Sequence, residues 1–185
     1  MSRLRDLLYG DLARYYELQG RPDTRPNALR LLGRLLHFRF LPNVICRTSR
    51  AAMLAGIPLL PGLLTYLNLV LFGLEATPKC EIGPGIFFAH PVGCVIGASR
   101  IGSNVTIFGG VTLGSRGLDI GFDPGQRPEV GDNVVLGSGC RVLGAIRVGD
   151  HATVGANAVV LSPVQDHATV VGIPARAVQV EVMQQ

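Results

Sequence analysis

The chain contains no tryptophan, aromatic residues make up only 6% of it, and charged residues only 16%. So few charged side chains cannot cover the surface of an isolated monomer in the usual way, and we expect partner subunits to cover much of it. The net charge of +4 comes from basic residues concentrated in the N-terminal third, and no nucleic-acid-binding motif is present. The composition favours a self-associating protein and excludes nucleic acid as the expected partner.

Cysteine is also scarce, and its spacing is uninformative for disulfides or metals. Cys46, Cys80, Cys94 and Cys140 show no paired or metal-binding pattern. We expect buried small hydrophobic side chains in a reducing cytosol, and no metal site. The first residues also lack the apolar region of a signal peptide, which predicts a cytoplasmic location.

Glycine is abundant, with 24 residues, and it accompanies a repeat of six. From Val130 onward an aliphatic residue recurs at every sixth position, and a small or apolar residue follows each one four positions later. The first row is Val130, Leu136, Val142, Val148, Val154 and Val160, and the second is Val134, Cys140, Ile146, Ala152, Ala158 and Val164. A period of six fits neither a helix nor an alternating strand. It predicts a triangular coil of about 18 residues per turn, with both rows inward.

The same repeat runs earlier, with two irregularities. We assign Ile82, Phe88, Val95, Ile101, Ile107 and Leu113 to the first row, and Ile86, Val92, Ser99, Val105 and Val111 to the second. The step from Phe88 to Val95 is seven, which predicts one extra residue just after His90. The repeat then stops at Gly114, so residues 115–128 form a predicted loop. Such a loop is either functional or a tolerated surface insertion.

The N-terminal region, residues 1–72, reads as helical. Amphipathic patterns predict helices over 2–19 and about 27–39. Residues 51–74 carry no charged side chain, and this uncharged run is formally long enough to cross a bilayer. Pro58, Pro61 and Asn68 interrupt it, however. We favour a helix buried against other copies of the same chain, and keep peripheral contact with the inner membrane as an alternative, because arginines lie just upstream.

Four motifs, in order, connect the repeat to a known family: Phe88-Ala-His90-Pro-Val-Gly93, Val95-Ile-Gly97, Val111-Thr-Leu-Gly114 and Gly172-Ile-Pro-Ala-Arg176. With the repeat, they resemble the hexapeptide acyltransferases, and among them the serine O-acetyltransferase-like family. The resemblance covers residues from about 72 to 178. It implies a mainly β fold, a left-handed parallel β-helix over 73–178 followed by a tail over 179–185. It further implies a homotrimer with acetyl-CoA as acetyl donor.

The chemistry explains why a histidine stands in such a motif. Acetyl transfer from a thioester to a hydroxyl requires a base for the hydroxyl proton, and a neutral imidazole suits that task. We therefore assign His90 as general base. Glu75, fifteen residues upstream, falls on the adjacent coil and is assigned to orient the imidazole, where serine acetyltransferases have aspartate. Transfer is expected to be direct, with amides near Gly109 and Gly110 as candidate oxyanion donors.

The resemblance also implies where coenzyme A binds. In this family the pantetheine lies in the groove between subunits, along small residues of the later coils. By motif, Gly114, Ser138 and Ala156 would line that groove, Pro174 and Ala175 would shape its end, and Arg176 would meet the phosphates. For each residue a purely structural role is the alternative, since tight coils also need small side chains.

Departures from the family concern the acceptor. Ala89 replaces an aspartate before the histidine, and Gln126-Arg127 replaces an arginine–histidine pair. Losing those groups argues against free serine and predicts a saccharide hydroxyl, as in the polysaccharide-type branch, bound by Asp119, Asp123, Gln126 and Arg127. The alternatives are a serine acetyltransferase with an altered pocket and a non-catalytic scaffold. A zinc carbonic anhydrase is disfavoured, because His151 and His167 are expected to be exposed.

Overall fold

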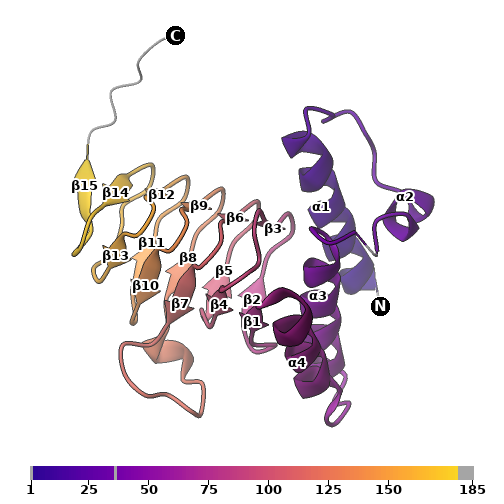
Figure 1. Ribbon diagram of the computed structural model, residues 1–185, viewed down its shortest axis with the longest axis horizontal. Coiled ribbons are helices and arrows are strands. Elements are labelled where there is room, and N and C mark those ends of the chain that lie inside the picture. Colours follow the sequence, from indigo (N-terminus) through magenta and orange to yellow (C-terminus); the bar gives the residue numbers. More distant parts are fainter. Residues whose placement is uncertain (1, 36, 179–185) are drawn as a thin grey trace.

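The computed structural model describes residues 2–35 and 37–178; the predicted tail, 179–185, lies outside the described residues. Helices gather at one end and a three-sided stack of short strands extends away from them (Figure 1). Every strand has only two or three residues, because each side of the coil must turn again within six. The repeat therefore builds a long prism whose axis runs across the strands.

The helices differ from the prediction after the first one. α1 spans Ser2–Leu18 and confirms the first predicted helix. The second predicted helix was too long: α2 covers only Ala28–Leu32, with Asn27 accepting a hydrogen bond from the Arg30 amide at its start. The single helix expected within 51–74 was also wrong. The chain forms α3 (Leu41–Leu54) and α4 (Leu60–Phe72), because Gly56 adopts a φ of 68° and Pro58 follows it.

No helix among the described residues is long and apolar enough to cross a membrane. α4 does leave a broad apolar face uncovered, with Leu63 63%, Tyr66 63% and Val70 62% exposed. Its only buried residue is Asn68, whose amide reaches the Pro42 carbonyl of α3. The expectation that a partner subunit covers this helix stays a prediction.

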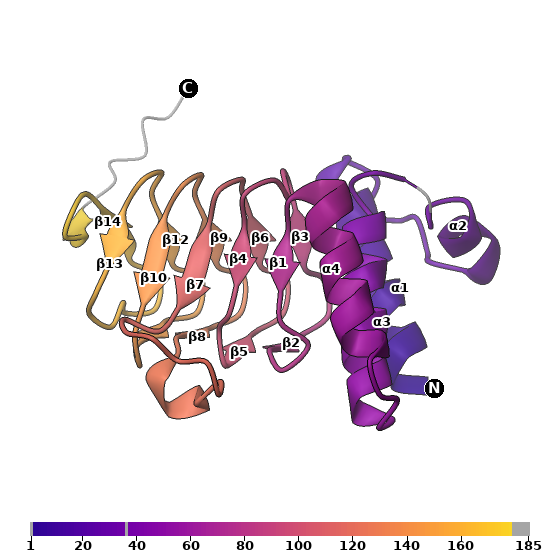
Figure 2. The ribbon, with the colours of Figure 1, turned by 60° about the horizontal axis from the view of Figure 1, so that its bottom comes forward.

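The strands form three sheets, one for each side of the prism (Figure 2). The first sheet has the order β1-β4-β7-β10-β13, the second β2-β5-β8-β11, and the third β3-β6-β9-β12-β14-β15. All pairings are parallel except β14 with β15. The bounds are β1 Glu75–Ala76, β2 Glu81–Ile82, β3 Phe87–Phe88, β4 Val95–Ile96, β5 Arg100–Ile101, β6 Thr106–Ile107, β7 Thr112–Gly114, β8 Glu129–Val130, β9 Val135–Leu136, β10 Arg141–Leu143, β11 Arg147–Val148, β12 Thr153–Val154, β13 Val159–Val160, β14 Thr169–Val171 and β15 Arg176–Val178.

The core confirms the repeat after Val130. All twelve residues of the two predicted rows are buried, from Val130 to Val164. Val164, however, was assigned to the wrong row, because it stacks on the first-row residue Val148. Removing these aliphatic groups from water stabilises the stack by roughly 25 cal/mol per Å² of apolar surface. Cys80, Cys94 and Cys140 are buried as well, and burial raises the pKa of Cys80 and Cys140 to about 12, so these thiols remain neutral.

The frame predicted around His90 needs a correction. Val95 is 37% exposed and Val92 is 68% exposed, whereas Ile96 and Cys94 are fully buried. Ser99 is likewise replaced in the second row by the buried Ala98. The inward step from Phe88 is therefore eight residues, to Ile96, and the next step is five, to Ile101. The corner that carries His90 is longer by two residues and the following side is shorter by one, so the coil as a whole gains the one residue that was predicted.

The helices cover the N-terminal end of the prism, where the first coil has no preceding coil to which its backbone could bond. Asp11 of α1 and Arg47 of α3 form a buried ion pair at 2.9 Å. Arg47 donates to the carbonyls of Ile82 and Gly83, and Asp11 accepts from the amides of Gly85 and Ile86. Burial raises the pKa of Asp11, against the opposing effect of Arg47. Side chains thus satisfy the open end that would otherwise be an unpaired edge.

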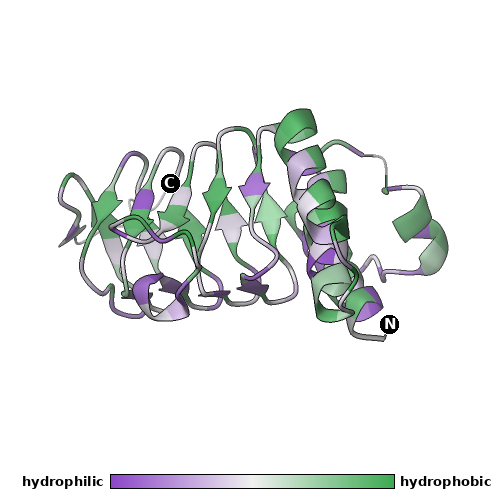
Figure 3. Cartoon of the chain, turned by 90° about the horizontal axis from the view of Figure 1, so that it is seen from below, coloured by the Kyte–Doolittle hydropathy of each residue, from purple (hydrophilic) through white to green (hydrophobic). Residues whose placement is uncertain are grey.

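The three sides of the prism carry different outward side chains. The second sheet presents an exposed alternation of charge, Glu81, Arg100, Glu129 and Arg147. The first and third sheets present mostly small or β-branched residues, such as Val95, Thr112, Val135, Thr153 and Val159. Hydrophilic strands accordingly gather along the lower border of Figure 3. The second sheet is the side best suited to water.

Candidate functional site

His90 leaves the prism at the corner where the third sheet passes into the first. We call this corner the His90 edge and define it as residues 89–94, 108–111, 137–140 and 155–158 of successive coils. His90 is exposed, and its carbonyl accepts a weak hydrogen bond from the buried Cys94 thiol at 3.7 Å. The two-residue widening therefore pushes an imidazole outward from an otherwise regular edge.

Glycine keeps the space above His90 open. A Cβ atom on Gly109 would lie 3.3 Å from the His90 Cβ. Gly93, Gly110 and Gly139 stack along the edge with φ between 70° and 74°, a conformation that costs glycine nothing. The edge is consequently smooth backbone beside His90, which a linear ligand can approach closely.

The two amides predicted as oxyanion donors differ. The Gly110 amide already donates to the Val92 carbonyl at 3.0 Å, so that part of the prediction is wrong. The Gly109 amide donates to no partner within the described residues. Only Gly109 keeps a backbone donor available beside the imidazole.

Glu75 begins β1, and its Cα pairs with that of Val95 on the next coil. The Gly93 amide donates to the Gly73 carbonyl, which stacks the start of β1 directly on the corner that carries His90. Both the Glu75 and His90 side chains are exposed, and neither makes a hydrogen bond within the part of the chain that the structure describes. The two residues share one corner on neighbouring coils, while their predicted contact stays a prediction.

The residues predicted to bind coenzyme A separate into groups. Ser138 and Ala156 are exposed on consecutive coils of the His90 edge, where the Asn157 amide donates to the Ser138 carbonyl. Gly114 ends β7 at the far side of the first sheet, and a Cβ there would meet nothing within 4 Å. Pro174, Ala175 and Arg176 follow β14 at the last coil, with Arg176 exposed. The residues predicted to line the coenzyme A groove therefore lie on two separate parts of one chain, the His90 edge and the far side of the first sheet.

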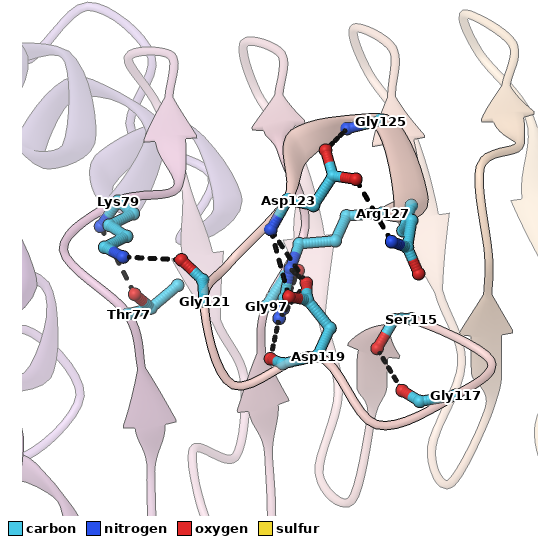
Figure 4. Close-up of polar contacts among 11 residues, drawn as sticks. Thr77, Lys79, Gly97, Ser115, Gly117, Asp119, Gly121, Asp123, Gly125 and Arg127 are labelled. Atoms are coloured by element: carbon cyan, nitrogen blue, oxygen red, sulfur yellow. Dashed lines mark hydrogen bonds and ion pairs between the residues drawn. The ribbon is translucent and has the colours of Figure 1, made fainter.

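The loop over 115–128 is held by its own polar side chains (Figure 4). Arg127 and Asp119 form an ion pair of 2.7 Å with little exposure, and Arg127 also donates to the Gly97 carbonyl. Asp119 accepts from the Asp123 amide, and Asp123 accepts from Gln126 and caps the short η1 helix (Pro124–Gln126). Burial would raise the pKa of Asp119, but hydrogen bonds from Arg127 and the backbone bring it below its ordinary value. All four residues predicted to bind a saccharide therefore bond with one another.

Two cationic residues that the sequence analysis missed fasten this loop to other coils. Arg116 donates to the carbonyls of Leu143 and Leu161, on the fourth and fifth coils. Lys79, on the first coil, donates to the Gly121 carbonyl at 3.0 Å, and its ammonium lies 5.6 Å from the Phe122 ring. The available signal was composition, because Lys79 is the single lysine of the chain.

The fastened loop and the first sheet enclose a cavity of about 380 Å³. Its lining brings together Glu75, Lys79, Gly114, Ser115 and Arg127, which lie far apart in the sequence. A space of this size holds a small polar molecule. Glu75 is the residue that connects this cavity to the His90 edge.

His151 and His167 are exposed, as predicted, and stack with ring centroids 4.8 Å apart at the opposite corner. Among the described residues no group of three or more His, Cys, Asp or Glu side chains is placed to hold a metal ion.

Comparisons with known proteins agree with the hexapeptide repeat and with the resemblance to serine acetyltransferases. The model of the bacterial transferase hexapeptide family (six repeats) matches residues 127–162. The serine acetyltransferase of Synechococcus elongatus is 42% identical over 123 residues, which are 66% of this chain and 49% of that protein. The one of Staphylococcus xylosus is 45% identical over 108 residues, 58% of this chain and 49% of that protein. The chain thus spans about half the length of these curated relatives, 49% in each case.

Solved structures are similar over nearly the whole chain. Neisseria gonorrhoeae serine acetyltransferase has a TM-score of 0.81 at 31% identity, and the match covers 96% of this chain and 67% of that chain. A soybean serine acetyltransferase complexed with serine has a TM-score of 0.79 at 33% identity, covering 95% and 69%. A serine acetyltransferase in complex with CoA has a TM-score of 0.79 at 30% identity, with the same 95% and 69%.

The chain therefore belongs to the hexapeptide transferase family that includes these serine acetyltransferases, and its fold is the left-handed parallel β-helix. The relatives named are serine acetyltransferases, so the comparisons do not support the polysaccharide-type branch.

Proposed function

From this family membership we propose that the chain is an acetyl-CoA-dependent O-acetyltransferase, with residues 73–178 as its transferase domain. One observation carries the proposal most directly. The repeat widens by two residues at a single corner, and there it presents an exposed imidazole beside glycine backbone and one coil above Glu75. A structural histidine would need no such opening. A CoA complex among the related structures supports a thioester as donor.

In the proposed mechanism His90 removes the acceptor hydroxyl proton as the oxygen attacks the thioester carbonyl. Glu75 orients the imidazole and stabilises the imidazolium that forms. The Gly109 amide is placed to stabilise the oxyanion of the tetrahedral intermediate. Collapse of that intermediate breaks the carbon–sulfur bond, and the imidazolium returns the proton to the thiolate of coenzyme A. No covalent acetyl-enzyme is needed, so both substrates bind together.

The donor groove is proposed to form between subunits of a homotrimer. Ser138 and Ala156 border it on the His90 edge, and Gly114 borders it from the far side of the first sheet of a neighbouring copy. Two of the three sides of the prism carry mostly small or β-branched outward residues, with Glu75 and Arg141 as the charged exceptions on the first sheet, and the charged second sheet is left for water. That distribution suits packing through the first and third sheets.

For the acceptor, the relatives favour serine over a saccharide. The chain departs from them at Ala89 and at Gln126-Arg127, and Arg127 is engaged with Asp119. We therefore propose a serine acetyltransferase activity with an altered acceptor pocket, and keep a sugar hydroxyl as the second candidate acceptor.

The test is release of coenzyme A thiol from acetyl-CoA in the presence of L-serine, of neutral and acidic monosaccharides, or of no acceptor. Acceptor-dependent thiol release supports the proposal, and mass spectrometry of the product identifies the acetylated hydroxyl. If acetyl-CoA neither binds nor reacts with any acceptor, the protein is a non-catalytic β-helix scaffold instead.

A further inference from the structure

The cavity beneath residues 115–128 contains a positive charge that no described carboxylate neutralises. Lys79 lies just after β1, and its exposed ammonium makes one hydrogen bond, to the Gly121 carbonyl at 3.0 Å. An ammonium has three N–H donors, so two remain available. Within the described part of the chain no carboxylate lies within ion-pair distance of it.

The other charges lining the cavity are Glu75 and Arg127. Arg127 is neutralised by Asp119 at 2.7 Å, and its side chain is only 11% exposed. Its remaining donors reach the Gly97 and Asp119 carbonyls. Arg127 is therefore a structural residue of the loop, and Lys79 is the cation of this cavity whose charge stays uncompensated.

The polar groups around this ammonium suit a small hydroxylated anion. The cavity also exposes the outward residues Thr77, Thr112 and Ser115, and its Gly114 border is free of side chain. A carboxylate or phosphate gains the attraction of an ion pair together with the hydrogen bond from an ammonium, whereas a neutral acceptor gains the hydrogen bond alone. Glu75 lines the same cavity and belongs to the corner that carries His90, which places the reacting hydroxyl at that end.

We propose that the cavity is the acceptor site and that Lys79 binds an anionic group of the acceptor. The acceptor class is thus a small molecule with both a hydroxyl and a carboxylate or phosphate. This inference rests on the proposed O-acetyltransferase activity. It also gives this chain its own anion-binding residue, at a position unrelated to Gln126 and Arg127.

The experiment compares acceptors that carry an anionic group with related neutral acceptors. Thiol release is measured with L-serine against L-serinamide, and with glucuronate and glucose 6-phosphate against glucose, for the wild type and Lys79→Met. In the wild type the anionic member of a pair should have the higher kcat/KM. Lys79→Met should lower kcat/KM for anionic acceptors by about 10- to 100-fold, mainly through KM, as loss of a hydrogen bond to a charged group implies. The pairs also show whether the anion is a carboxylate or a phosphate.

Lys79 also fastens the loop, so a matched control must remove a loop contact without removing the cavity charge. Arg116→Met does this, because Arg116 pins the same loop to Leu143 and Leu161 and does not line the cavity. Arg116→Met should affect charged and neutral acceptors equally, and Lys79→Arg should restore the preference for anions.

Two results overturn the inference while leaving the proposed function intact: an equal loss for neutral and anionic acceptors in Lys79→Met, or a rise in the KM of acetyl-CoA alone. Absence of thiol release with every acceptor in the wild type counts against the proposed function itself.

Discussion

Two corners of the same prism stabilise their stacks in opposite ways. At the corner between the second and third sheets, which we call the Asp edge (residues 102–105, 131–134, 149–152 and 165–168), side chains bond the coils together. Each aspartate carboxylate accepts a hydrogen bond from a backbone amide of the preceding coil. Asp132 accepts from the Ser103 amide, Asp150 from the Asp132 amide, and Asp166 from the Asp150 amide. At the His90 edge glycine takes three of the corresponding positions, Gly93, Gly110 and Gly139, and Asn157 takes the last one. The coils meet there mainly through backbone hydrogen bonds.

The difference between the two corners indicates that the Asp edge stabilises the stack, whereas the His90 edge is open to a ligand. Aspartate, asparagine and histidine fill the Asp edge, and four of them, Asn104, Asn133, His151 and His167, take the left-handed conformation that glycine takes at the His90 edge. The left-handed backbone can therefore be built with side chains. Glycine at Gly93, Gly110 and Gly139 leaves the part of the His90 edge nearest the imidazole as a surface on which an extended ligand can lie against main chain. Three experiments test this contrast, and a fourth tests the loop over 115–128.

The largest effect is expected from His90→Ala. Removing the general base should lower turnover by about 10²- to 10⁴-fold. The circular dichroism spectrum and the oligomeric state should not change, because the side chain is exposed. His151→Ala, at the Asp edge, is the control and should retain full activity. Undiminished turnover in His90→Ala would remove the mechanism.

Obstruction of the His90 edge should come next in size. Ala156→Trp adds a bulky ring on an exposed residue with ordinary backbone angles, and it should raise the KM of acetyl-CoA about tenfold or more, which corresponds to about 1.4 kcal/mol of lost binding. Gln165→Trp places the same ring on the Asp edge and should leave that KM unchanged. Equal effects at both corners would contradict the assignment of the groove.

A smaller, purely structural effect is expected at the Asp edge. Asp150→Ala removes the acceptor of the Asp132 amide at 2.9 Å and should cost about 1 kcal/mol of unfolding free energy. For a chain of this length the midpoint of thermal unfolding should fall by roughly 2–4 °C. The kinetic constants at 25 °C should stay the same. A changed KM for acetyl-CoA would show that the two corners are not independent.

The smallest effect concerns acid pH and the loop over 115–128. The pKa of Asp119 is held below its ordinary value of 3.8, so its ionised form is favoured by the folded loop. That contribution is present above the unfolded-state pKa and is lost as the pH falls through the lower folded-state pKa. Hydrogen–deuterium exchange of the loop should therefore be insensitive to ionisation of Asp119 between pH 7 and 5, and accelerate only in stronger acid. Asp119→Asn should exchange faster already at pH 7; an unchanged rate there would mean that the Asp119–Arg127 pair does not hold the loop.

Much of this architecture could be predicted because it is local and periodic. The period of six after Val130 specified the inward residues as far as Val160, and the interruption after Gly114 specified the loop. Beyond Val160 the frame changes, because Val164 stacks on Val148 and Val170 on Val154. Prediction was less accurate around His90, where Val95 and Ile96 are both aliphatic and either could face inward. Only contact with the coils above and below selects Ile96. The helices 27–39 and 51–74 were misjudged for a similar reason, since packing and the Gly56–Pro58 turn set their ends.

Contacts between distant segments were beyond the sequence. Asp11 and Arg47 are 36 residues apart and meet only because the helices close the first coil. Lys79 and Gly121 meet only because the loop folds back along the prism.

The sequence by itself determined the coil and most of its inward rows, and it located the irregular corner at His90, because a six-residue period leaves few choices for side-chain direction. Only the tertiary structure decided which polar groups are available to a ligand. Arg127 forms an ion pair with Asp119, whereas Lys79 bonds only to a backbone carbonyl of the loop. This difference depends on which charges the folded loop brings within hydrogen-bonding distance of one another.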